Sequence, residues 1–132
     1  YRGLVPLVIA KALQDNGEGG EVLFIDSSLV DEFWRDPVAV REYLEHFGLQ
    51  RVRHFLMTTQ EFVETEEYRS LDSVGLVFVD GYRTEEQARF DYEAVEALLA
   101  PRGVVLFHDN MTERESNIYG AERIYRTTVK AT

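Results

Sequence analysis

Three short apolar runs that each lead into an aspartate constrain the fold of this sequence more than any other feature. They are "VLFID", "VGLVFVD" and "VVLFHD", and they end at Asp26, Asp80 and Asp109. Each run is continuous and bounded by glycine or polar residues, which is typical of a strand buried on both faces of a parallel sheet. The sequence therefore favours a sheet with helices packed on its two sides.

Helical patterns separate the apolar runs along the chain. Asp36 and Pro37 form a favourable helix start, and Thr84 is a suitable N-cap for a later helix. The elements expected, in order, are a helix over 4–13, a strand over 22–25, a helix over 38–47, a weaker strand over 51–57, a short helix over 58–65, a strand over 74–81, a helix over 84–99, a strand over 103–110 and a last helix from 120. This alternation predicts a doubly wound, mainly parallel α/β sheet.

Composition narrows the class of partner. The 132 residues include 24 acidic and 14 basic side chains, for a formal net charge of -10, which disfavours binding to nucleic acid or to an anionic membrane surface. The sequence has no cysteine, which excludes disulfides, thiolate metal sites and thiol nucleophiles. Its apolar runs are far shorter than the roughly 20 residues of a membrane-spanning helix. We expect a soluble cytoplasmic protein with a small-molecule partner.

Ligands of open parallel sheets bind beyond the carboxyl ends of the strands, so the residues that follow each apolar run are candidate site residues. These are Asp26, Thr58 to Gln60, Asp80 to Arg83, and His108 to Asn110. A carboxylate in the position of Asp26 can accept hydrogen bonds from both hydroxyls of a ribose. Asp26 could equally be a helix cap or a solvated loop residue.

Asp80 and Asp109 end strands that should be neighbours, and Asn110 adds an amide oxygen beside the second carboxylate. These hard donors suit magnesium or calcium better than zinc, although acidic residues also follow strands in ordinary loops. His108 could act as a general base because its ordinary pKa is near neutrality. We expect it instead to be a core residue, since the side chain before Asp109 should point to the other face.

The lone tryptophan and the other two histidines are expected to be structural. Trp34 is assigned to the core rather than to a stacking platform, and His46 and His54 lie on a predicted helix and a predicted strand. The acidic run from Glu64 to Glu67 is interpreted as a solvated face or loop.

Taken together, the strand ends resemble the class I S-adenosylmethionine-dependent methyltransferases. They look most like the metal-dependent catechol and caffeoyl-coenzyme A O-methyltransferases and the macrocin O-methyltransferase type. The resemblance runs from Tyr1 to about Met111 and is most specific in "VDGYR" and "LLAPRGVVLFHDN". It implies that residues 1–132 are a single partial domain with a Rossmann-like sheet that lacks its first strand and is incomplete at its C-terminus. The implied activity is methyl transfer from S-adenosylmethionine to a small hydroxylated acceptor.

The resemblance also implies roles for individual residues. Asp80, Asp109 and Asn110 would hold a divalent ion such as magnesium. The residues that would contact S-adenosylmethionine are Gly3 at the methionine end, Asp26 at the ribose, Thr59 and Gln60 at the adenine, and Asp80 and Tyr82 near the cofactor. His108 and Arg83 are the candidate catalytic side chains.

Two departures from the family pattern favour a rival interpretation. Val5 stands where the family usually has serine, and Arg83 aligns with a catalytic lysine although arginine stays protonated and is a poor base. A degenerate, non-catalytic methyltransferase-like module is therefore an alternative, and another nucleotide-binding enzyme with a Rossmann-like sheet is a second. A sheet without its central strand would leave backbone groups unpaired, so a homodimer or strand exchange is also expected.

Overall fold

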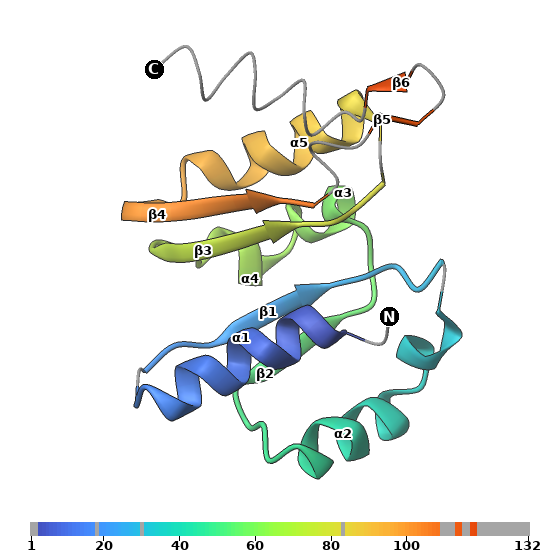
Figure 1. Cartoon of the computed structure of the whole chain (residues 1–132), viewed down its shortest axis with the longest axis vertical. Helices are drawn as coiled ribbons and strands as arrows, with labels where there is room; N and C mark the ends of the chain where they lie inside the picture. The colour runs from blue at the N-terminus through green and yellow to red at the C-terminus, as the bar shows by residue number, and fades with distance from the viewer. Residues whose placement is uncertain are drawn as a thin grey trace. The chain divides into compact units, whose positions relative to one another are not determined.

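The computed structural model describes residues 3–17, 19–29, 31–82, 84–108, 113–114 and 117–118. The chain divides into two compact units, an N-terminal unit (Tyr1–Thr65) and a C-terminal unit (Glu66–Thr132), which we describe one at a time. In both units parallel strands alternate with helices, as the sequence predicts (Figure 1).

The N-terminal unit is built on two parallel strands with one long helix packed against them. Helix α1 (Leu4–Asp15) precedes β1 (Val22–Ile25), which pairs in parallel with β2 (Val52–Phe55) (Figure 1). One cluster of buried core residues in this unit is formed by Leu7, Ala10, Val22 and Leu49. An apolar face of α1 thus covers the small sheet, which confirms the predicted helix and the first two strands.

The chain between β1 and β2 forms the 3-10 helix η1 (Glu32–Arg35) and then α2 (Pro37–His46). Asp36 caps α2 by accepting hydrogen bonds from the amides of Val38 and Ala39 at 2.9 and 3.2 Å. This confirms the predicted helix start. The sequence did not indicate η1, because one short turn carries no readable apolar period.

After β2, a capping box begins the short helix α3 (Thr59–Phe62). The Thr58 hydroxyl accepts from the Glu61 amide at 3.2 Å, and the Glu61 carboxylate accepts from the Thr58 amide at 2.7 Å. The Glu61 carboxylate also accepts from the Thr58 hydroxyl at 2.9 Å, and the bonds from the Thr58 amide and hydroxyl lower the pKa of the Glu61 carboxyl. The predicted short helix is therefore present, and the separate helix α4 (Glu66–Arg69) opens the C-terminal unit.

The C-terminal unit pairs β3 (Val74–Val79) with β4 (Leu99–Phe107) in parallel. Helix α5 (Glu85–Glu96) connects them and packs on one face of the pair (Figure 1). Its buried Ala88 lies with Tyr92 and Phe107 in a small apolar cluster. The last two predicted strands are thus neighbours, which confirms that their carboxyl ends lie side by side.

The predicted end of the third long helix is wrong. Helix α5 stops at Glu96, and Leu99 already pairs with Val74 as the first residue of β4. Pro101 accounts for the difference, because a proline disfavours helical backbone at the residue before it and has no amide to donate. The segment "APRG" forms a bulge inside β4, where Arg102 has a φ of 74°.

The prediction that both faces of these strands are buried is not met in the C-terminal unit by itself. Side chains alternate along a strand, and Phe107 lies on the face covered by α5. The apolar residues of the opposite face that are exposed are Leu76, Val104 and Leu106. One side of this two-stranded sheet is therefore apolar and exposed.

Beyond β4 the structure describes only a short antiparallel pair, β5 (Glu113–Arg114) with β6 (Asn117–Ile118). The helix predicted from Gly120 lies outside the described residues. Across the described part of the chain, every helix is too short or too polar to cross a membrane.

Candidate functional site

Asp26 lies directly beyond β1 and organises the turn that follows. Its Oδ1 accepts a hydrogen bond from the Ser28 amide at 2.5 Å, and its own amide donates to the Phe55 carbonyl at 3.1 Å. Ser28 is fully buried with a φ of 58°, and its hydroxyl donates to the Asp31 carbonyl. A left-handed serine persists only where its surroundings hold it. Asp26 is therefore part of a well-fixed turn, and its carboxylate has acceptor capacity beyond that one bond.

His54 of β2 packs beside this turn. Its ring lies 5.2 Å from the Phe24 ring and 5.1 Å from the Trp34 ring. Burial lowers the pKa of His54, and the charge of Asp26 and a hydrogen bond with the Asp26 main chain offset part of that effect. Within the described residues its Nε2 is buried without a hydrogen-bond partner. This packing agrees with the structural role predicted for His54.

We expect acid to destabilise the protein in part through His54. Its pKa in the folded protein lies below its ordinary value of 6.5, so the unfolded chain binds the proton more readily. The stability that neutral His54 contributes is fully present above pH 6.5. It is lost as the pH falls from there through the pKa of His54 in the folded protein. Urea unfolding between about pH 7.5 and 5 should show a weaker pH dependence for His54→Phe than for the wild type. An unchanged pH dependence in that variant, or an equal change in the exposed control His46→Gln, contradicts the assignment.

Gly3, a predicted cofactor contact, is held against the aromatic core of the N-terminal unit. It has a φ of 65°, and a Cβ at this position would lie 2.7 Å from two ring carbons of Trp34. Trp34 is 4% exposed and meets the rings of Phe24 and Phe33 edge-on at 4.8 and 5.1 Å. The prediction that Trp34 is a core residue is confirmed, and its ring requires glycine at position 3.

Thr59 and Gln60, the predicted adenine contacts, occupy the first turn of α3. The side chain of Thr59 is half-buried and that of Gln60 is exposed. Because β1 and β2 run in parallel, α3 begins at the same edge of the small sheet as Asp26. The N-terminal unit therefore gathers its predicted ribose and adenine residues at one strand edge, while their roles stay predictions.

Asp80 and His108 come together at the carboxyl end of the β3–β4 pair. Oδ1 of Asp80 lies 3.0 Å from Nδ1 of His108, and both side chains are 49% exposed. The His108 amide donates to the Val79 carbonyl at 2.9 Å. The expectation that His108 points into the core is wrong, because residue 108 is exposed. Its ring lies 6.1 Å from the Phe78 ring, on the face of the β3–β4 pair opposite Phe107.

The Asp80 contact indicates which ring nitrogen of His108 carries a hydrogen. An ionised carboxylate can only accept, so Nδ1 of His108 must carry the hydrogen, and the lone pair of the neutral ring is then on Nε2. A histidine oriented in this way by a carboxylate is suited to take up a proton. Both residues could be named from the sequence, but their pairing could not.

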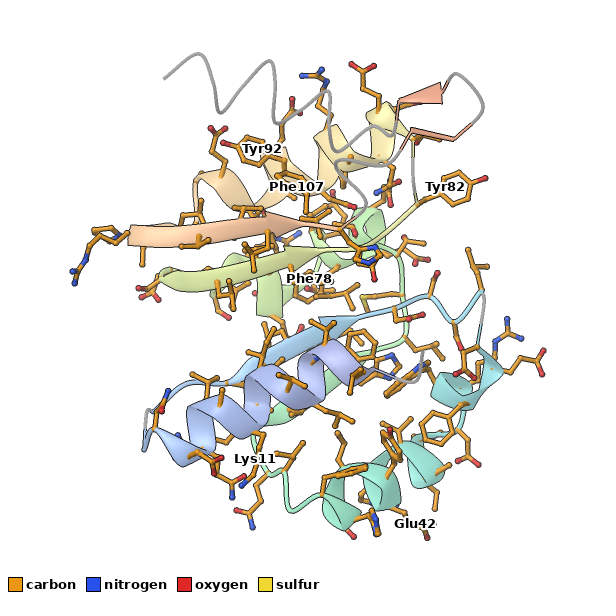
Figure 2. All side chains as sticks on the ribbon, in the orientation of Figure 1. Lys11, Glu42, Phe78, Tyr82, Tyr92 and Phe107 are labelled. Carbon is orange, nitrogen blue, oxygen red and sulfur yellow. The ribbon has the colours of Figure 1, made fainter. Side chains whose placement is uncertain are left out.

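The remaining predicted site residues are Tyr82, Arg83, Asp109 and Asn110. Tyr82 is 75% exposed, and its side chain points away from the β3–β4 pair (Figure 2). Arg83, Asp109 and Asn110 lie outside the described residues. In the part of the chain that the structure describes, no group of three acidic, histidine or cysteine side chains could hold a metal. Of the predicted metal ligands, only Asp80 is described.

Asp91 of α5 is a buried polar residue that sequence reasoning missed. It is 8% exposed, and the Gln87 side-chain amide donates to its Oδ1 at 2.7 Å. The residue type gave no sign of its burial, because charged side chains are mostly exposed. Its spacing of three residues from the buried Ala88 was the signal available, since such residues share a helix face.

The chain matches a protein-family model described as a methyltransferase domain over residues 1–110. No curated protein matches it. The family match covers most of the chain, and its parallel strands alternating with helices agree with the fold of such enzymes. The chain therefore belongs to this methyltransferase family, which implies methyl transfer from S-adenosylmethionine.

Proposed function

We propose that the protein transfers the methyl group of S-adenosylmethionine to a hydroxyl oxygen of a small acceptor. The observation that carries the choice of oxygen is the contact of 3.0 Å between Asp80 and His108. A hydroxyl must lose its proton as its oxygen is methylated, and an oriented imidazole can accept that proton. Family membership supports the methyl-transfer part of the proposal.

The reaction is a direct displacement. A bond forms between the acceptor oxygen and the methyl carbon while the bond from that carbon to sulfur breaks, and the sulfur leaves as a neutral thioether. The hydroxyl proton passes to Nε2 of His108, and the Asp80 carboxylate stabilises the imidazolium that forms. The rate of such a displacement depends on holding oxygen, carbon and sulfur in line.

The residues of the N-terminal unit fit the nucleoside part of the cofactor, which supplies the methyl group when bound. Asp26 is held by its turn and can accept hydrogen bonds from ribose hydroxyls. Thr59 and Gln60 supply a hydroxyl and an amide at the same strand edge for the adenine. The Trp34 ring leaves no room for a side chain at Gly3. The bare backbone of Gly3 would let the methionine part of the cofactor approach closely.

A magnesium ion held by Asp80, Asp109 and Asn110 is the finer part of the proposal. The half-exposed Asp80 carboxylate is the kind of hard donor that magnesium prefers. Such an ion would lower the pKa of an acceptor hydroxyl and fix its orientation. Arg83 would steady negative charge on the acceptor without serving as a base.

Replacing Asp26 should weaken cofactor binding. Asp26→Ala loses charge-assisted hydrogen bonds to the ribose, and we expect the dissociation constant for S-adenosylmethionine to rise about 10- to 100-fold. Asp26→Asn keeps an oxygen that can accept from the Ser28 amide, so its melting temperature should change little. It should still bind S-adenosylmethionine more weakly than the wild type, because its amide carries no charge. Isothermal titration calorimetry with and without magnesium measures both effects.

The matched control for this titration is Asp72→Ala, which removes an exposed aspartate from the loop before β3. Equal binding by Asp26→Ala and the wild type would rule out the ribose role. A folded wild-type protein that binds no S-adenosylmethionine would instead favour the degenerate, non-catalytic module.

A further inference from the structure

Asp91 is the only charged side chain among the described residues that is buried, at 8% exposure. Removing a carboxylate from water is costly unless hydrogen bonds replace its hydration. The Gln87 side-chain amide supplies one such bond to Oδ1 at 2.7 Å. A buried carboxylate held in this way can in turn fix a neighbouring part of the structure.

The neighbouring part is the backbone directly after β3. A Cβ built on Gly81 would lie 2.9 Å from Oδ2 of Asp91, which is closer than real side chains approach. The Asp91 carboxylate therefore occupies the space that a side chain at position 81 would need. At this point helix α5 contacts the loop after β3 through the Asp91 carboxylate, which packs against the backbone of Gly81.

Gly81 is covalently joined to Asp80, whose Oδ1 lies 3.0 Å from Nδ1 of His108. Any shift of the Gly81 backbone would move the Asp80 carboxylate relative to the imidazole. We propose that Asp91 is a positioning residue that fixes Gly81 and so holds Asp80 against His108. Its importance for catalysis rests on the proposed function. Asp91 acts through Gly81 and Asp80 and does not itself touch the reacting atoms.

The direct test is nuclear magnetic resonance of the imidazole of His108 in the full chain. The protein has three histidines, so His46→Gln and His54→Gln variants assign the signals. Asp91→Ala removes the packed carboxylate, and Gly81→Ala inserts a methyl group against it. Both changes should shift the Nδ1 signal of His108, whereas the control Glu93→Ala, an exposed carboxylate on the same helix, should leave it in place.

A thermal unfolding cycle tests whether the two positions act through one contact. Gly81→Ala alone should lower the melting temperature by about 4 °C or more, because the added methyl group collides with the carboxylate. The same change in an Asp91→Ala background should cost much less, since the collision is gone. Gly81→Ala also keeps the proposal testable if Asp91→Ala does not fold. Equal costs in the two backgrounds would overturn the proposed contact.

Methyl transfer separates positioning from a merely structural role. Asp91→Ala should lower kcat about 10- to 100-fold while the dissociation constant for S-adenosylmethionine stays within about twofold. An unshifted His108 signal in both variants would overturn the proposal, even if both melt earlier. The proposed function would fail on a different result, namely a folded wild type that binds no S-adenosylmethionine. In that case the His108 signal still reports whether Asp91 holds Asp80 against His108.

Discussion

Trp34→Ala is expected to lower the free energy of unfolding by about 3–5 kcal/mol. The Trp34 ring is 4% exposed and packs edge-on against Phe24, Phe33 and Tyr43. Its removal would leave a cavity among these rings and beneath Gly3. Urea unfolding should be followed by circular dichroism, because the variant has no tryptophan left to report by fluorescence.

Phe47→Ala is the matched control for this prediction. Phe47 is an aromatic residue of the same unit but is 48% exposed, so its loss should cost roughly 1 kcal/mol or less. Similar costs for the two variants would show that Trp34 is not the centre of the cluster. S-adenosylmethionine binding by Trp34→Ala should also weaken, because the backbone of Gly3 would lose its support.

His108→Gln is expected to slow methyl transfer about 10²- to 10⁴-fold, the contribution typical of a general base. The affinity for S-adenosylmethionine should change little, because the imidazole is proposed to act on the acceptor. Asp80→Asn should also slow the reaction, since an uncharged amide does not stabilise an imidazolium. Single-turnover transfer to the best wild-type acceptor from a panel of phenols, catechols and sugars measures both rates.

His46→Gln is the control for this experiment, because His46 is an exposed residue at the end of α2. It should leave the rate of methyl transfer unchanged. Full activity of His108→Gln would overturn its role as base. The transfer of the proton would then require another group, and the contact between Asp80 and His108 would be structural.

Most of the described elements could be predicted from the sequence, because they depend on local preferences. Asp36, Thr58 and Thr84 were recognised as helix starts, and each accepts hydrogen bonds from the amides of the first turn. The errors arose where local preference conflicts with pairing. Leu99 continues the apolar period of α5 but joins β4, because Pro101 and the ladder with Val74 favour extended backbone.

Some predictions have no test in the described residues. The metal ligands Asp109 and Asn110 and the catalytic candidate Arg83 lie outside them. A single domain over residues 1–132, a cytoplasmic location and a homodimer also stay predictions. The family match supports the methyltransferase class and does not extend to the acceptor.

The sequence by itself determined the alternation of parallel strands and helices and the acidic residues that follow β1 and β3. These features follow from the spacing of apolar residues and from short-range hydrogen bonds. Both depend only on residues a few positions apart in the sequence. Only the tertiary structure decided that His108 meets Asp80, that Asp91 is buried against Gly81, and that Trp34 lies on Gly3. Each of these contacts joins residues distant along the chain, and the direction of a side chain beyond the end of a strand depends on the packing around it.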